Sequence, residues 1–139
     1  MDFQEQIYEF SNHINFHMKN IAHRHNLSFS QIQFLLSIPI EGISMSNLAD
    51  RLAIDISTLS RNVRKLGEKE LISQISDKND NRISNIFLSK LGEEKIDLIN
   101  ASFEEISNQI LTNLPVEFQQ NLADTLEQIN WSLTKHRGQ

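Results

Sequence analysis

The residue types that are missing or scarce limit what this chain can do chemically. Its 139 residues include no cysteine and only four glycines. Without cysteine there is no disulfide, no thiol nucleophile and no metal site built on thiolates. The glycines form neither a GxGxxG nor a GxxxxGK[ST] phosphate-binding loop, and no GxSxG nucleophile motif occurs. The sequence therefore carries no motif for nucleotide binding or acyl transfer, and we predict a protein that is not an enzyme and has no cofactor.

Long apolar runs are missing as well. No apolar stretch approaches the ~18 residues of a membrane-spanning helix, and the chain starts with the acidic segment Met1-Asp2-Phe3-Gln4-Glu5 instead of the basic start of a signal peptide. Hydrophobic residues make up 39% and charged residues 22%, which is typical of a soluble globular protein. We expect a cytoplasmic protein whose length suits one domain with its own core.

The net charge of −5 is unevenly distributed. Residues 51–92 hold eight Lys and Arg against five Asp and Glu, a surplus of three positive charges. The rest of the chain holds five basic and thirteen acidic residues, a surplus of eight negative charges. A basic segment in an acidic protein is the charge pattern expected of a part that contacts nucleic acid.

Residues 44–88 predict two short helices followed by a β-hairpin. Ser44 is a favourable N-cap for the first helix, Ile54 marks the turn, and Asp55 is a favourable N-cap for the second. The core face of the first helix is formed by Leu48, Ala49 and Leu52. This order of elements is that of a winged helix-turn-helix, a module that binds DNA.

The second helix divides into two faces. Its apolar face consists of Ile56, Leu59, Val63 and Leu66. The opposite face consists of Ser57, Arg61 and Arg64, flanked by Thr58 and Lys65 on one side and by Ser60 on the other. Hydroxyl and guanidinium groups are suited to phosphate contacts and to guanine recognition. The alternative is an ordinary amphipathic helix with a solvated basic face.

The hairpin predicts a wing. Residues 71–76 and 83–88 are rich in β-branched and apolar types, and the polar segment 77–82 between them favours a turn. The candidate DNA contacts at its tip are Lys78, Asp80 and Arg82. Such a wing can place an arginine in a minor groove, and we expect Asp80 to orient a nearby arginine by a charge-assisted hydrogen bond. The alternative is a plain surface hairpin.

Long helices flank this segment. Residues 2–25 carry an apolar seam with spacings of three and four: Phe3, Ile7, Phe10, Ile14, His17 and Ile21. Ser28 and Gln31 predict a capping box for a second helix that ends before Pro39. A long helix is predicted over residues 89–114, and a last helix is predicted to begin at Pro115. The seams need a partner, so we predict a homodimer.

Several motifs in this chain resemble those of the MarR family (multiple antibiotic resistance regulators) of bacterial transcription factors. The family patterns are L-T-x-x-Q-x-x-[VIL]-L before the DNA-binding part, S-T-[VL]-[ST]-R on the recognition helix, D-x-R in the wing and L-T-x-x-G after it. The matching segments are Leu27-Ser28 with Gln31 and Leu35, Ser57-Thr58-Leu59-Ser60-Arg61, Asp80 with Arg82, and Leu88-Ser89 with Gly92. Their joint occurrence in order covers nearly the whole chain.

The resemblance implies a mainly α fold with a small β-hairpin wing, in a single domain over residues 1–139. It implies a reading head at about 28–92 and dimerisation helices at about 2–25 and 89–135. It further implies a cytoplasmic DNA-binding transcriptional regulator, a ligand-responsive repressor that acts as a homodimer on a pseudo-palindromic operator. A small-molecule effector is expected between the dimer helices and the reading head.

Two positions depart from the family pattern. Glu70 stands where the family usually has glycine, and a non-glycine residue in a left-handed turn costs about 1 kcal/mol. We therefore expect this helix end to be shaped differently. Gln74 stands where the first wing strand often carries arginine, so this strand offers no charge for a phosphate contact.

Two alternatives to this interpretation stay open. His13 and His17 are spaced i, i+4 on the first helix, a spacing that can hold a metal ion, which suggests a zinc-responsive regulator. No further ligands are fixed by the sequence, and His17 is better explained as a hydrogen-bonded residue of an interface. The other alternative is a winged-helix scaffold that binds proteins and lacks sequence-specific DNA binding.

Overall fold

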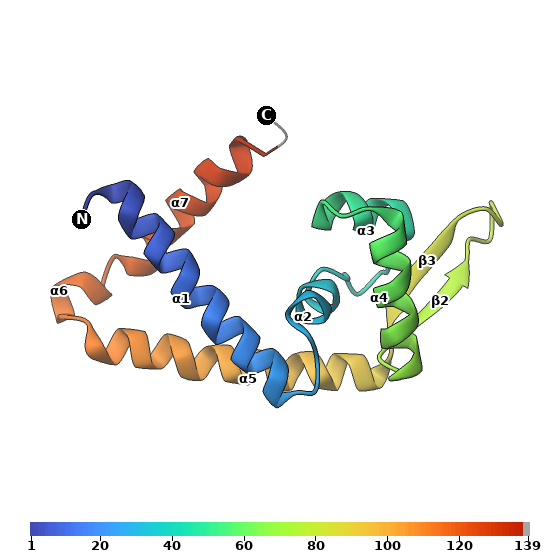
Figure 1. Cartoon of the computed structure of the whole chain (residues 1–139), viewed down its shortest axis with the longest axis horizontal. Helices are drawn as coiled ribbons and strands as arrows, with labels where there is room; N and C mark the ends of the chain where they lie inside the picture. The colour runs from blue at the N-terminus through green and yellow to red at the C-terminus, as the bar shows by residue number, and fades with distance from the viewer. Residues whose placement is uncertain (138–139) are drawn as a thin grey trace. The chain divides into compact units, whose positions relative to one another are not determined.

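The computed structural model describes residues 1–137, and within that range it contains seven helices and three short strands (Figure 1). In chain order they are α1 (Phe3–Arg24), α2 (Phe29–Leu36), β1 (Ile43–Ser44), α3 (Met45–Leu52), α4 (Ile56–Glu68), β2 (Ile72–Ser76), β3 (Ser84–Leu88), α5 (Lys90–Asn113), α6 (Val116–Gln119) and α7 (Leu122–Lys135). They fall into two compact units, one of residues 1–102 and one that starts at residue 103. The expected fold class, mainly α with a small wing, is confirmed.

Local capping interactions start the helices where the sequence predicts them. The Ser28 hydroxyl accepts the backbone N–H of Gln31 (3.1 Å), and the Gln31 side chain accepts the N–H of Ser28 (3.0 Å), so the predicted capping box is present. Ser44 caps α3 by accepting the N–H of Asn47 at 3.2 Å. Asp55 caps α4 in the same way. Each cap satisfies a backbone donor that a helix end would otherwise leave unpaired.

A single apolar core holds the first unit together. The completely buried side chains come from α1, α2, α3, α4, β3 and α5: Ile21, Ile32, Phe34, Leu35, Leu48, Leu59, Leu66, Ile86 and Ile99. Three of the four residues predicted for the apolar face of α4 are buried, but Ile56 is 53% exposed, so that part of the prediction is wrong. Ile56 is the first residue of the helix and lies at the edge of the apolar face, where the core does not cover it.

The sheet has one strand more than the sequence predicts. Its order is β1-β3-β2 and both pairings are antiparallel, with Ile43 opposite Ile86 and Gln74 opposite the same Ile86 on the other side. The turn before β1 contains Gly42 at φ 84°, and a Cβ there would lie 2.4 Å from the ring of Phe87. Only glycine therefore fits this turn without displacing the ring.

The end of α4 corrects the expectation about Glu70. Its backbone adopts the left-handed conformation (φ 61°), the one that a glycine favours, so the helix end is not reshaped by the substitution. Two hydrogen bonds from Ser89 fasten this turn: its hydroxyl donates to the carbonyl of Glu70 (2.6 Å), and its N–H donates to the carbonyl of Leu71 (3.0 Å). The surrounding contacts therefore impose a conformation that the side chain disfavours.

We predict that Glu70→Gly stabilises the protein by about 0.5–1 kcal/mol, because it removes the left-handed penalty and the greater freedom of glycine in the unfolded chain offsets only part of the gain. Urea unfolding followed by circular dichroism measures the change. Glu68→Gly is the matched control, since Glu68 is helical and the same replacement there lowers stability. Equal effects of the two variants would contradict the strain at Glu70.

The second unit corrects the prediction of one last helix that begins at Pro115. Pro115 is the N-cap of the short helix α6, and α7 follows after a break at Asn121, whose backbone is not helical (φ −112°, ψ 3°). The Gln119 amide donates to the carbonyls of Leu111 (2.7 Å) and Leu114 (2.8 Å), both at the end of α5. These bonds tie Gln119, the last residue of α6, to the end of α5, where the Leu111 carbonyl also accepts the N–H of Leu114 (3.2 Å).

Large apolar side chains remain exposed on the terminal helices of the single chain. On α1 they are Phe3, Ile7, Tyr8, Phe10 and Phe16, and on α7 they are Leu126, Ile129, Trp131 and Leu133. Only the C-terminal part of the predicted α1 seam is covered, with Ile21 completely buried and Ile14 half-buried. In the described part of the chain, no helix combines the length and apolarity required to cross a membrane.

Candidate nucleic-acid interface

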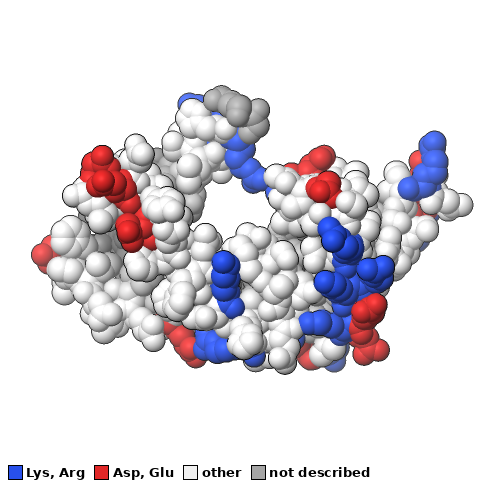
Figure 2. Space-filling model, viewed as in Figure 1, with Lys and Arg blue, Asp and Glu red and all other residues white. Residues whose placement is uncertain are grey.

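The packing of α4 determines which of its side chains face solvent. Leu59, Val63 and Leu66 fix one side of the helix in the core. The predicted contacts on the other side are exposed, with the exception of the half-buried Thr58: Ser57, Ser60, Arg61, Arg64 and Lys65. Figure 2 shows Lys and Arg side chains gathered over α4 and again at the end of the hairpin formed by β2 and β3. The geometry therefore presents a basic helix face beside a basic hairpin tip.

The first turn of α4 carries its own negative charge. Oδ1 of Asp55 accepts hydrogen bonds from the Ser57 hydroxyl (2.6 Å) and from the backbone N–H of Thr58 (2.7 Å). These bonds, the one from Ser57 foremost, lower the pKa of Asp55 to about 2, so the carboxylate is ionised at neutral pH. It occupies the positive end of the helix, where a phosphate would otherwise be favoured. Ser57 and Thr58, both predicted DNA contacts, are thus engaged in the helix cap.

The hairpin tip is a hydrogen-bonded turn. The N–H of Asp77 donates to the carbonyl of Ile83 (2.8 Å), and the N–H of Ile83 donates to the carbonyl of Asp80 (3.0 Å). The carboxylate of Asp77 accepts the N–H of Asn79 at 2.8 Å. The Lys78 side chain is exposed beside them. The tip therefore has internal bonds that hold its backbone in one shape.

Arg82 and Asp80 form a two-bond ion pair at this tip. Nε of Arg82 donates to Oδ1 of Asp80 and Nη2 donates to Oδ2, both at 3.0 Å, and the Arg82 backbone N–H adds a third bond of 3.0 Å. This pairing lowers the pKa of Asp80 and raises that of Arg82. The Arg82 side chain is 90% exposed. The predicted orientation of an arginine by Asp80 is confirmed, and a guanidinium is held at the end of the hairpin.

Two other basic residues of the 51–92 segment serve the fold. Nζ of Lys69 donates to the carbonyl of Asn26, just past the end of α1. Nη1 of Arg51 donates to the carbonyl of Ser37 at the end of α2 (2.8 Å). Both complement the negative ends of helices. The count of positive charges in the sequence does not distinguish these structural cations from those on the exposed face.

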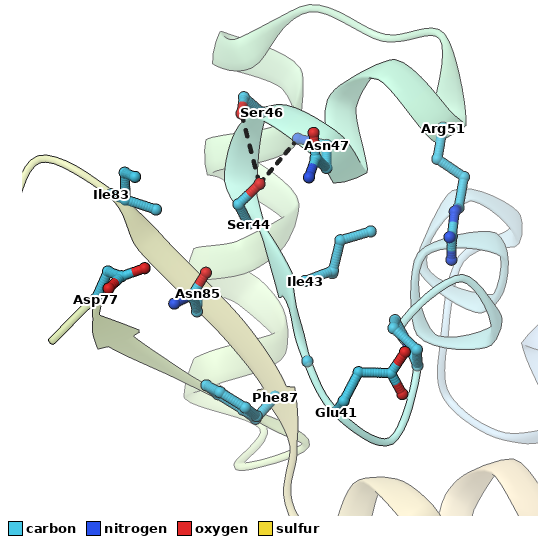
Figure 3. Close-up of a pocket in the computed structure, with 12 residues that line it drawn as sticks. Glu41, Ile43, Ser44, Ser46, Asn47, Arg51, Asp77, Ile83, Asn85 and Phe87 are labelled. Atoms are coloured by element: carbon cyan, nitrogen blue, oxygen red, sulfur yellow. Dashed lines mark hydrogen bonds between the residues drawn. The ribbon is translucent and has the colours of Figure 1, made fainter. Parts of the chain in front are cut away.

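A groove that the sequence does not reveal lies between α3, β1 and β3, and it extends to the start of the hairpin tip (Figure 3). It has a volume of about 790 Å³, and its walls include Arg51, Asp77, Asn85 and Phe87. None of the nine predicted DNA contacts lines it. The groove depends on the pairing of β1 with β3, and a two-residue strand carries no periodic signal in the sequence.

His13, His17 and His25 each have a close neighbour in the structure. Nε2 of His13 lies 3.6 Å from a carboxylate oxygen of Glu9, and the ring of His17 packs edge-on against Phe16. Among residues 1–137 no group of three or more metal-binding side chains is assembled. Nε2 of His25 lies 3.1 Å from the Ser102 hydroxyl, a contact that links the end of α1 to α5. Burial, with help from nearby Lys95, lowers the pKa of His25.

Comparison with known proteins agrees with this geometry. The profile of the MarR family matches residues 40–84, which contain α3, α4 and most of the hairpin. Two uncharacterized HTH-type transcriptional regulators of Bacillus subtilis (strain 168) are similar: YxaD is 31% identical over 86 residues (62% of this chain), and YdgJ is 29% identical over 101 residues (72% of this chain). The match spans about three-fifths of the length of these relatives, 60% and 62%.

Solved structures share the fold. One of them, the Staphylococcus aureus MepR–DNA complex, superposes with a TM-score of 0.72 at 19% identity and covers 95% of this chain and 98% of that one. At this identity the likeness concerns the fold alone. It extends over the long helices as well as over the part that the family profile matches.

Proposed function

The chain belongs to the MarR family, and on that premise we propose that it is a DNA-binding transcriptional regulator, with α4 in a major groove and the β2–β3 wing at an adjacent minor groove. The observation that carries the proposal is the exposed basic face of α4 beside the guanidinium of Arg82. The proposed contacts are Ser57, Thr58, Ser60, Arg61, Arg64, Lys65, Lys78, Asp80 and Arg82. Of these, Ser57 and Thr58 act chiefly in the helix cap at Asp55, and Asp80 acts chiefly by orienting the guanidinium of Arg82.

We also propose that the regulator is a homodimer. The exposed apolar side chains of α1 support this, since an unpaired helix face with Phe3, Ile7 and Phe10 open to water is unfavourable. The exposed apolar residues of α7 provide a second, independent face of the same kind. A two-fold dimer carries two reading heads, so its operator is an inverted repeat.

Repression and ligand response are finer parts of the same proposal. A dimer that covers its operator excludes other proteins from that DNA, which makes repression the simplest outcome, and in this role it works in the bacterial cytoplasm. A groove of about 490 Å³ between the end of α2 and the start of α5 supports an effector site between a long helix and the reading head. An effector that prefers one spacing of the two heads would change DNA affinity.

A salt titration tests DNA binding against the alternative of a protein-binding scaffold. For a DNA-binding surface, the logarithm of the binding constant falls linearly with the logarithm of salt concentration, with a slope of about −0.9 per phosphate contact. Lys19→Ala on α1 is the control and should leave the slope unchanged. A wild-type protein that binds duplex DNA with no salt dependence, or fails to bind it, would favour the scaffold.

Arg82→Ala should weaken operator binding by about 5- to 100-fold and leave the fold intact, because Arg82 is exposed at the wing tip and supports no core residue. Fluorescence anisotropy with labelled operator measures the affinity, and the thermal unfolding temperature checks the fold. Asn81→Ala, an exposed neighbour on the same turn, is the control. Operator binding as tight as that of the wild type would remove the minor-groove role from Arg82.

Arg61→Ala should cost more affinity than Lys65→Ala, because position 61 lies nearer the centre of the exposed face of α4 and position 65 lies at its edge. Loss of Arg61 should also relax the base preference at one position of each half-site. Loss of Lys65 should weaken all sequences evenly and make the salt slope shallower by about 1 for each phosphate that is no longer bound. An unchanged selected motif for Arg61→Ala would reassign this residue to the phosphate backbone.

A further inference from the structure

Ile56 is an exposed apolar side chain at the border of the polar face of α4. It is the first residue of α4 and is 53% exposed, while Leu59, Val63 and Leu66 are buried. At about 100° per residue, Ile56 lies about 40° from Ser60 and about 80° from Arg64 around the helix axis. It therefore borders the same exposed face as the proposed contacts and is not one of the buried core residues that hold this helix.

The polar groups around Ile56 limit what can approach it. The carboxylate of Asp55 is ionised and already accepts bonds from Ser57 and Thr58. A phosphate is repelled by this charge, and so is a base edge with two acceptors, such as N7 and O6 of guanine, whereas thymine offers one acceptor, O4, beside its methyl group. The start of α4 is therefore better suited to a base edge with an apolar group.

One base meets this requirement in the major groove. Thymine is the base whose C5-methyl group projects into that groove, and apolar side chains contact it there. The N-terminal residues of a recognition helix are the ones that approach base edges. We propose that Ile56 contacts the C5-methyl of a thymine and selects that base at one position of each half-site. This inference rests on the proposed DNA binding through α4.

Deoxyuridine provides the test, because it pairs as thymidine does and lacks only the C5-methyl. A duplex obtained by selection with the wild-type protein is resynthesised with each thymidine replaced in turn by deoxyuridine. For the wild type, one replacement per half-site should reduce affinity by about fourfold, the equivalent of one methyl group removed from water, and by about 16-fold when both half-sites carry it. Ile56→Ala should bind the two duplexes equally well.

Ile75→Ala is the matched control. Ile75 is also an exposed isoleucine (55%), but it lies on β2 in the wing, which faces a minor groove where no C5-methyl is presented. This variant should keep the full sensitivity to deoxyuridine, whatever its overall affinity. Thermal unfolding of both variants checks that they fold.

The outcomes separate this inference from the proposed function. A selected motif with no methyl-sensitive thymidine, or an Ile56→Ala protein that keeps the wild-type sensitivity, overturns the role of Ile56 and leaves DNA binding in place. A protein that selects no duplex sequence overturns both.

Discussion

Replacing Phe10 and Ile14 together by glutamate is expected to separate the proposed homodimer and to reduce operator affinity by at least about a hundredfold. The two residues lie one turn apart on α1, where Phe10 is 53% exposed in the single chain and Ile14 is half-buried. If a second copy covers these two apolar side chains, the replacement buries two carboxylates without partners at the interface. This costs several kcal/mol. The residues proposed to contact DNA stay unchanged.

The loss of DNA affinity follows from the loss of the link between the heads. In a dimer the second head binds intramolecularly, which raises overall affinity by about 100- to 10,000-fold over that of one head. Asn12→Glu with Asn15→Glu is the control, because it adds the same two charges to exposed positions elsewhere on α1.

Sedimentation and a binding titration on the same samples measure both effects. A Phe10→Glu, Ile14→Glu protein that is monomeric and binds with wild-type affinity would show that dimerisation does not organise recognition. A protein that stays dimeric would place the interface elsewhere.

Gly92→Ala is expected to destabilise the protein by about 2–4 kcal/mol. A Cβ at position 92 would lie 2.1 Å from the carbonyl oxygen of Leu71, which is backbone and already accepts the N–H of Ser89 at 3.0 Å. The added carbon cannot be accommodated by a side-chain rotation, so α5 must move away from the start of the wing. Ser89, whose hydroxyl accepts the Gly92 N–H (2.9 Å), would move with α5 and lose its hydrogen bonds to the carbonyls of Glu70 and Leu71.

Gly67 offers the matched comparison, since a Cβ there meets nothing within 4 Å. Gly67→Ala lies inside α4 and should raise stability by up to about 1 kcal/mol. Urea unfolding of both variants gives the two changes. If Gly92→Ala destabilises the protein by less than an ordinary surface substitution does, α5 does not pass this close to Leu71.

The sequence predicts those features of this molecule that depend on a few neighbouring residues. Ser28, Ser44 and Asp55 cap helices because each side chain reaches a backbone N–H three residues ahead. The wing follows from two apolar strands around a polar turn, and the paired residues Asp80 and Arg82 are only two positions apart in the sequence. None of these features requires knowledge of distant contacts.

The features that were missed depend on distant or exceptional contacts. The pairing of β1 with β3 joins segments more than 40 residues apart, and Lys69 reaches Asn26 across a similar separation. Periodicity assigns Ile56 to the apolar face but does not show that the core stops short of it. Glu70 keeps a left-handed backbone because Ser89, 19 residues later, binds its carbonyl. The intrinsic backbone preference of glutamate alone predicts that the left-handed conformation is avoided at this position.

Selection of bound fragments from random duplex DNA tests the central claim most directly. If two copies of α4 enter successive major grooves, the enriched sequences form an inverted repeat with half-site centres about 10–10.5 base pairs, or roughly 34–36 Å, apart. The same selection with Arg61→Ala should keep the spacing and relax the base preference at one position of each half-site. No enrichment, or an enriched motif without two-fold symmetry, would contradict the account of a dimeric regulator that reads DNA through α4.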